Sequence, residues 1–109
     1  MSFQENGKTL YGVSAKAAAV VLEGLGVAAV GFNCSAGPDR MLPVLKEMKQ
    51  YASIPLIAKP NAGMPKLLPD GTTGYDMGPK VFADHMEQML SAGADLVGGC
   101  CGSDRKSVV

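Results

Sequence analysis

The stretch Val97-Gly98-Gly99-Cys100-Cys101-Gly102 joins a short apolar run to a pair of glycines and two adjacent thiols. This pattern predicts a buried strand that ends in a tight, close-packed turn. An earlier stretch follows the same plan, because residues 26–34 align with residues 93–101. Each begins with a glycine, continues with four strand residues and a second glycine, and ends in a cysteine. We therefore expect two strands whose carboxyl ends carry thiols at equivalent positions.

Adjacent cysteines also have simpler explanations. Buried cysteines often serve as small hydrophobic residues, and neighbouring ones can form a strained disulfide. The chain has three cysteines, which cannot all pair within one molecule. A reducing compartment keeps such thiols free for metal binding or catalysis. Together with the repeat, this odd count favours a thiolate site.

Composition limits the partners. The 109 residues suffice for one core, so we expect a single domain over residues 1–109. Ten basic and ten acidic residues leave the chain neutral, which argues against nucleic acid as a partner. The longest apolar run, residues 17–22, is far shorter than the roughly 20 residues of a membrane span, and no basic-then-apolar leader opens the chain. We expect a cytoplasmic protein with no membrane partner.

Three helices are predicted from apolar spacing and from their end signals. The first follows Ser14 as its N-cap and stops at Gly26. The second starts at Gly37-Pro38 and the third at Gly78-Pro79, each with proline at the first helical position. The expected inward stripes are Ala18, Val21, Leu22 and Leu25; then Met41, Val44, Leu45, Met48 and Ala52; and last Phe82, Met86, Met89 and Leu90.

Strands are predicted before, between and after these helices. Residues 2–11 indicate a short strand followed by a turn at Asn6-Gly7. Residues 27–32 are apolar throughout, as in a parallel strand covered on both faces. Residues 54–58 and 95–99 give two more strands, and the segment between residues 59 and 75 predicts a long mobile loop.

Alternation of strands and helices, at about thirty residues per unit, predicts parallel βαβ units with right-handed crossovers. The chemically notable loops all follow strands, as in a (β/α)8 barrel, where the active site lies at the carboxyl ends of the strands. Such a barrel needs about 250 residues, so this chain would supply about half of one. A small doubly wound open sheet is the alternative fold.

In a barrel, one strand would lie between the two thiol-ended strands, whose axes would be about 10 Å apart. Barrel curvature tips strand ends inward and permits three sulfurs to approach one zinc ion at ~2.3 Å each. Three protein ligands leave the fourth tetrahedral position open, which is the pattern of catalytic rather than structural zinc.

Three motifs carry a resemblance to a known family. They are Gly31-Phe32-Asn33-Cys34, Pro60-Asn61-Ala62-Gly63 and Gly98-Gly99-Cys100-Cys101-Gly102. In order and spacing the chain resembles the homocysteine S-methyltransferase family, most closely the homocysteine-binding barrel of the cobalamin-dependent methionine synthases. The resemblance covers nearly the whole chain but only the C-terminal half of that (β/α)8 TIM barrel.

The resemblance implies that Cys34, Cys100 and Cys101 bind Zn2+ and are the catalytic residues, and that Asn61 offers its side-chain oxygen to the metal while substrate is absent. It further implies that homocysteine takes the open position as a thiolate, the nucleophilic form of sulfur. This thiolate then attacks a methyl group and yields methionine. Asn33 and Gly99 are expected to support the cysteine turns from just outside the metal ligands, Asn33 by orienting the Cys34 loop through hydrogen bonds.

The resemblance also implies that cobalamin and folate domains are partners of the parent enzyme and are not bound by these residues. The sequence departs from the family after Gly102, where Ser103-Asp104-Arg105 stands in place of the usual threonine and later histidine. The family's first strands have no counterpart here, so the isolated chain is expected to bind zinc without necessarily turning over.

Two other functions stay open. One is a non-catalytic zinc or thiol-binding half-barrel module that acts as an oligomeric interaction unit. The other is a redox protein that forms a reversible disulfide between Cys100 and Cys101. In either case, unpaired strand edges and an uncovered apolar face predict a homo-oligomer or the docking of a missing half-barrel.

Overall fold

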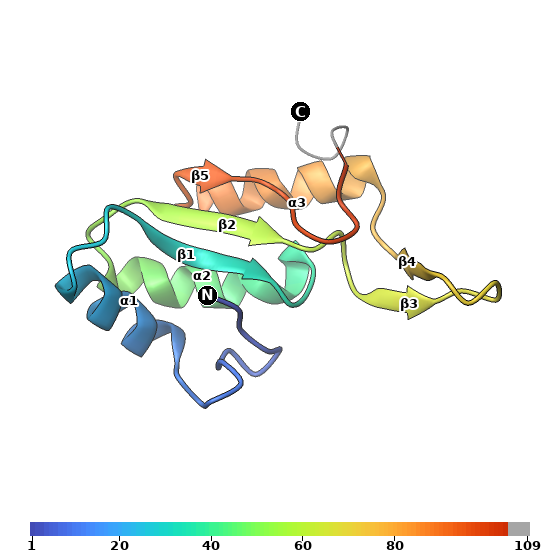
Figure 1. The fold of residues 1–109 in the computed structure, drawn as a ribbon. Coiled ribbons are helices and arrows are strands. Elements are labelled where there is room, and N and C mark those ends of the chain that lie inside the picture. The colour runs from blue at the N-terminus through green and yellow to red at the C-terminus, as the bar shows by residue number, and fades with distance from the viewer. Residues whose placement is uncertain (105–109) are drawn as a thin grey trace.

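Three parallel strands form the central sheet of the structure, a computed structural model that describes residues 1–104 (Figure 1). They are β1 (Val30–Cys34), β2 (Leu56–Pro60) and β5 (Leu96–Val97), in the order β1-β2-β5. The prediction of parallel βαβ units is confirmed. Each strand begins one to three residues later than the sequence indicated, and β5 pairs over two residues only.

The helices are α1 (Ala15–Gly24), α2 (Pro38–Tyr51) and α3 (Pro79–Ser91). Their predicted starts are confirmed: the Ser14 hydroxyl accepts a hydrogen bond of 3.1 Å from the Ala17 amide, and α2 and α3 both begin with proline. Helices α2 and α3 cover one face of the sheet, and α1 packs beside α2 (Figure 1). None of the helices in residues 1–104 is long and apolar enough to cross a bilayer.

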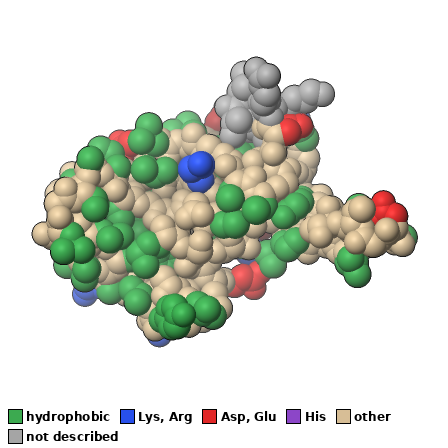
Figure 2. Space-filling model, viewed as in Figure 1, with side chains coloured by type: hydrophobic (Ala, Val, Ile, Leu, Met, Phe, Trp, Pro, Cys, Tyr) green, Lys and Arg blue, Asp and Glu red, His purple; other side chains and the backbone are tan. Residues whose placement is uncertain are grey.

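The core lies between the sheet and these helices. Alternate residues of β1 and β2 point into it, and the largest fully buried side chains include Phe3, Phe32, Met41, Leu45, Met48, Leu56, Phe82 and Met89. Within residues 1–104, no helix or strand covers the opposite face of the sheet, which is turned toward the viewer in Figure 2. Asn33 and Lys59 are exposed there, so the prediction that the first parallel strand is covered on both faces is wrong.

Two predicted helix stripes need correction. Val21 and Leu25 of the first stripe are 58% and 75% exposed, and α1 instead buries Ala15, Ala18 and Ala19. These small side chains allow α1 to approach α2 closely, which turns the larger residues outward. Leu90 at the end of α3 is likewise 46% exposed.

The N-terminal segment contains the predicted turn but not the predicted strand. The Gly7 amide donates to the Gln4 carbonyl over 2.9 Å, which closes the turn at Asn6-Gly7. Met1 follows the edge of β1: its amino group donates to the Gly31 carbonyl and its carbonyl accepts from the Asn33 amide, both at 2.9 Å. The Ser2 hydroxyl adds a hydrogen bond to the Asn33 carbonyl over 3.1 Å. The chain then leaves the sheet because Phe3 is buried in the core.

The long loop predicted after β2 contains a small antiparallel hairpin. Its strands are β3 (Pro65–Leu67) and β4 (Thr73–Tyr75), and it projects from the body of the protein (Figure 1). The tip closes through a 2.8 Å hydrogen bond from the Leu68 amide to the Thr72 carbonyl, with Gly71 at φ +84°. The strands were missed because they are short and mostly exposed, without an apolar alternation.

Candidate metal centre

The three cysteines meet at the carboxyl edge of the sheet. Cys34 is the last residue of β1, and Cys100 and Cys101 follow β5, with β2 between them as predicted. The Cys101 sulfur lies 3.6 Å from that of Cys34 and 4.0 Å from that of Cys100, and all three lie within 4.8 Å of one another.

Sulfurs at ~2.3 Å around a tetrahedral zinc ion are about 3.8 Å apart, so the observed spacing fits one metal ion. The same distances are far longer than an S–S bond of about 2.05 Å, and the three thiols are free. The donor set is soft and thiolate-rich, which suits zinc.

Cys34 is positioned by an unusual turn. Both Cys34 and Ser35 have positive φ angles, of +65° and +68°. This left-handed conformation is uncommon outside glycine and concentrates at functional sites. It ends β1 abruptly, and a 2.9 Å hydrogen bond from the Ala36 amide to the Cys34 carbonyl closes the turn.

The end of β2 holds the second cysteine turn. The Cys100 amide donates to the Pro60 carbonyl over 2.9 Å, and the Ala62 amide donates to the Cys101 carbonyl over 3.0 Å. Because β2 lies between the two thiol-bearing strands, these bonds fix Cys100 and Cys101 at the height where β1 presents Cys34.

Asn61 forms hydrogen bonds to both cysteine turns, the one after Cys34 and the one that contains Cys101, and the residue is only 5% exposed. Its backbone amide donates to the Ala36 carbonyl over 3.0 Å, and its Oδ1 accepts from the Cys101 amide over 3.1 Å. A carbonyl oxygen has two lone pairs, so one remains. The weak metal-binding role expected of Asn61 therefore stays a prediction beside this observed hydrogen bond.

The two expected supporting residues lie close to the cysteines. Asn33 is exposed on the open face and binds the N-terminal segment through its backbone, so its orienting role stays a prediction. A side chain at Gly99 would overlap Ser103, whose hydroxyl donates to the Cys100 carbonyl over 2.6 Å. Gly99 thus leaves room for the residue that closes the cysteine turn.

The thiols differ in acidity. The pKa of Cys34 is lowered, first by the neighbouring Cys100 thiol and then by the Ser35 amide, both of which stabilise the thiolate. The pKa of Cys100 is raised, first by burial and then by the presence of Cys34. Cys34 is therefore the thiol of this pair that loses its proton first.

Tyr75 is a site residue that the sequence analysis missed. It ends β4, and its ring packs over Gly102, where any Cβ would overlap it. Burial raises its pKa, and the adjacent Cys101 raises it further. The hairpin that brings Tyr75 back to the cysteines has no apolar pattern, so the sequence held no signal for this contact.

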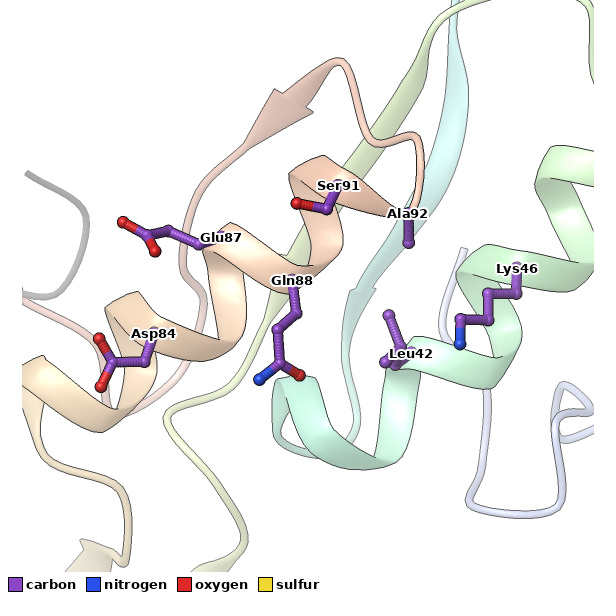
Figure 3. Close-up of a pocket in the computed structure, with 7 residues that line it drawn as sticks. All are labelled: Leu42, Lys46, Asp84, Glu87, Gln88, Ser91 and Ala92. Carbon is purple, nitrogen blue, oxygen red and sulfur yellow. The ribbon is translucent and has the colours of Figure 1, made fainter.

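A second concavity lies on the helical face. A groove of about 690 Å3 runs between α2 and α3, with Leu42 and Gln88 facing each other across it and Asp84 and Glu87 pointing away from α2 (Figure 3). It is larger than the cavity of about 290 Å3 beside Cys100 on the open face. It contains no cysteine, and its charged residues are exposed, so the chemistry favours the cysteine edge.

Three thiols gathered at the carboxyl edge of a parallel sheet define an α/β protein with a candidate thiolate site. A model of the homocysteine S-methyltransferase family matches residues 1–108. The methionine synthases of Mycobacterium leprae and Mycobacterium tuberculosis are each 36% identical to the chain over 104 residues. The chain belongs to the homocysteine S-methyltransferase family.

The matched relatives are much longer than this chain. The alignments cover 94% of the chain but 8% of the Mycobacterium leprae protein and 9% of the Mycobacterium tuberculosis protein. The chain therefore corresponds to a small part of those proteins.

Changing Gly102→Ala should destabilise the protein and weaken metal binding, because Gly102 has φ +77° and an added Cβ would displace the Tyr75 ring. Gly71→Ala is the matched control, since Gly71 has φ +84° with no atom within 4 Å of an added Cβ. We expect backbone strain of about 1–3 kcal/mol in both variants and an additional loss in Gly102→Ala. Thermal unfolding and zinc titration measure these effects; equal behaviour of the two variants would remove Tyr75 from the site.

In metal-free protein, iodoacetamide should modify Cys34 at lower pH than Cys100, because the thiolate is the reactive form and the two pKa values move in opposite directions. Both side chains are partly buried, so access does not decide the order. Peptide mass spectrometry across a pH series gives the midpoint for each residue. Earlier modification of Cys100 would contradict the order of deprotonation given above.

Proposed function

We propose that residues 1–109 are part of a homocysteine-binding domain in a zinc-dependent methyltransferase that converts homocysteine to methionine. The observation that carries this proposal is the spacing of the Cys34, Cys100 and Cys101 sulfurs, which suits one zinc ion. Family membership supports homocysteine as the methyl acceptor. The enzyme would be a methionine synthase type of homocysteine S-methyltransferase acting in the cytoplasm.

We further propose that the chain is the C-terminal half of a (β/α)8 barrel. Parallel sheets are normally covered on both faces, whereas this sheet has helices on one face and leaves the other open (Figure 1). In a closed barrel the open face would be the interior, and the cysteines would lie at the carboxyl ends of the strands, where barrel enzymes carry their active sites.

In this function Cys34, Cys100 and Cys101 would hold the metal, and a site with three protein ligands would have room for the substrate sulfur. Bound zinc supplies the positive charge that keeps this sulfur a thiolate at neutral pH. The protein orients the site: Asn61 fixes the Cys101 amide, and Tyr75 packs over Gly102 beside it. The thiol proton would be released to solvent when the substrate binds, so no general base from this chain is required. The substrate thiolate then forms a bond to the methyl carbon as the donor's bond to that carbon breaks.

The methyl donor would come from elsewhere. We propose methylcobalamin or methyltetrahydrofolate, held by other domains of the parent enzyme and not by the residues of this chain. The alternative is a non-catalytic zinc or thiol-binding module, which the open sheet face favours. The two functions differ in whether the metal gains a ligand from homocysteine.

Cobalt(II) substitution tests the proposal. We expect one cobalt ion per site with intense thiolate-to-metal absorption, and loss of this binding in Cys34→Ala because two thiolates are too few. Homocysteine should change the absorption, and homoserine, which lacks the thiol, should not. Ser91→Ala in the helical groove is the control variant. A spectrum that homocysteine leaves unchanged would favour the non-catalytic module.

The uncovered sheet predicts self-association or docking of a missing half-barrel. Leu96 and Val97 of β5 are 55% and 40% exposed at a strand edge, and burying apolar surface contributes about 25 cal/mol per Å2. Light scattering at micromolar concentration should show a homodimer or larger oligomer, which Leu96→Lys weakens. Leu67→Lys at the hairpin, where Leu67 is 81% exposed, should have no effect. A stable monomer would contradict the half-barrel.

A further inference from the structure

Lys59 lies on the open face of the sheet, between the two thiol-bearing strands. In the sheet register it stands opposite Asn33 of β1, and on its other side Gly98 follows β5. The Lys59 side chain runs across Gly98, where an added Cβ would lie 3.4 Å from the Lys59 Cε. The next residue, Pro60, accepts the hydrogen bond from Cys100. Lys59 is therefore one residue, about 3.3 Å of strand, from the level of the cysteines.

A cavity of about 290 Å3 joins Lys59 to the cysteine cluster. Its lining includes Met1, Asn33, Ile57, Lys59 and Cys100, and the Met1 amino group is already bound to the Gly31 carbonyl. This volume is near the lower end of small-molecule pockets, roughly 300 Å3, and suits a ligand of amino-acid size. No acidic residue of the described chain lines the cavity.

The Lys59 ammonium has no ion-pair or hydrogen-bond partner within residues 1–104. Three of the chain's other cations, Arg40, Lys66 and Lys80, each have a carboxylate within 3.4 Å. Within the described part of the chain, Lys59 thus places an unpaired positive charge in a cavity beside the three thiols. Such a charge is suited to bind the anionic group of a ligand whose sulfur reaches the cysteines.

We propose that Lys59 binds the carboxylate of the amino-acid thiol whose sulfur completes the cysteine site. This inference rests on the proposed function and adds the group that distinguishes an amino-acid thiol from a simple one. A short carbon chain joins the sulfur of homocysteine to its carboxylate. With the sulfur at the cluster, the carboxylate lies within a few ångströms of it, close enough to enter the cavity that Cys100 and Lys59 both line.

Cobalt-loaded protein gives the test, with homocysteine and propane-1-thiol as probes titrated by thiolate-to-metal absorption. Lys59→Met should weaken homocysteine binding about tenfold or more, because a hydrogen bond to a charged group is lost. Propane-1-thiol, which has no carboxylate, should bind Lys59→Met and the unmodified protein equally. Lys59→Arg keeps the charge and should retain most of the homocysteine affinity.

Lys46→Met is the matched control, because Lys46 lies on α2 beside the helical groove (Figure 3). It should bind both thiols as the unmodified protein does, and circular dichroism verifies that each variant is folded. Unchanged homocysteine affinity in Lys59→Met, or equal loss for both thiols, would overturn the role of Lys59 alone. Failure of homocysteine to perturb the cobalt spectrum of the unmodified protein would overturn the proposed function as well.

Discussion

The short segment that follows β2 holds the site together. Parallel strands are about 5 Å apart, so the ends of β1 and β5 would be separated by about 10 Å without further constraint. Hydrogen bonds from Cys100 to Pro60, and between Asn61 and Cys101, draw the last turn over the end of the middle strand. The left-handed backbone at Cys34 directs the Cys34 thiol toward the turn that contains Cys100 and Cys101. Backbone bonding to one central segment therefore places three sulfurs together within an open sheet.

The sequence was most informative where local chemistry decides the structure. Ser14, Pro38 and Pro79 marked helix starts because a side-chain acceptor and a fixed φ act within a single turn. The internal repeat indicated two parallel strands with thiols at matching ends, and the structure brings those thiols within 4.8 Å. Because the pattern occurs twice, the meeting of the three cysteines could be predicted from the sequence, whereas their binding of a metal stays a prediction.

Features that depend on distant packing could not be predicted. Helix α1 buries Ala15 and Ala19 in place of Val21 because of how closely it approaches α2. The spacing of apolar residues in the sequence gives no information on that distance. The contact of Tyr75 with Gly102 depends on a hairpin whose strands are three residues each and carry no apolar alternation. Asn61 was recognised from its motif, yet its hydrogen bond to the Cys101 amide required the structure, because the two residues are 40 positions apart.

The separation of 67 positions between Cys34 and Cys101 has a thermodynamic consequence. A cation held by both would close a loop that contains α2, β2, the hairpin, α3 and β5. A cation that binds the folded chain and not the unfolded one would stabilise this closed loop by its own binding free energy. Metal affinity and the free energy of unfolding would then be linked, so a change that loosens either cysteine turn would also lower the stability of the metal-loaded fold.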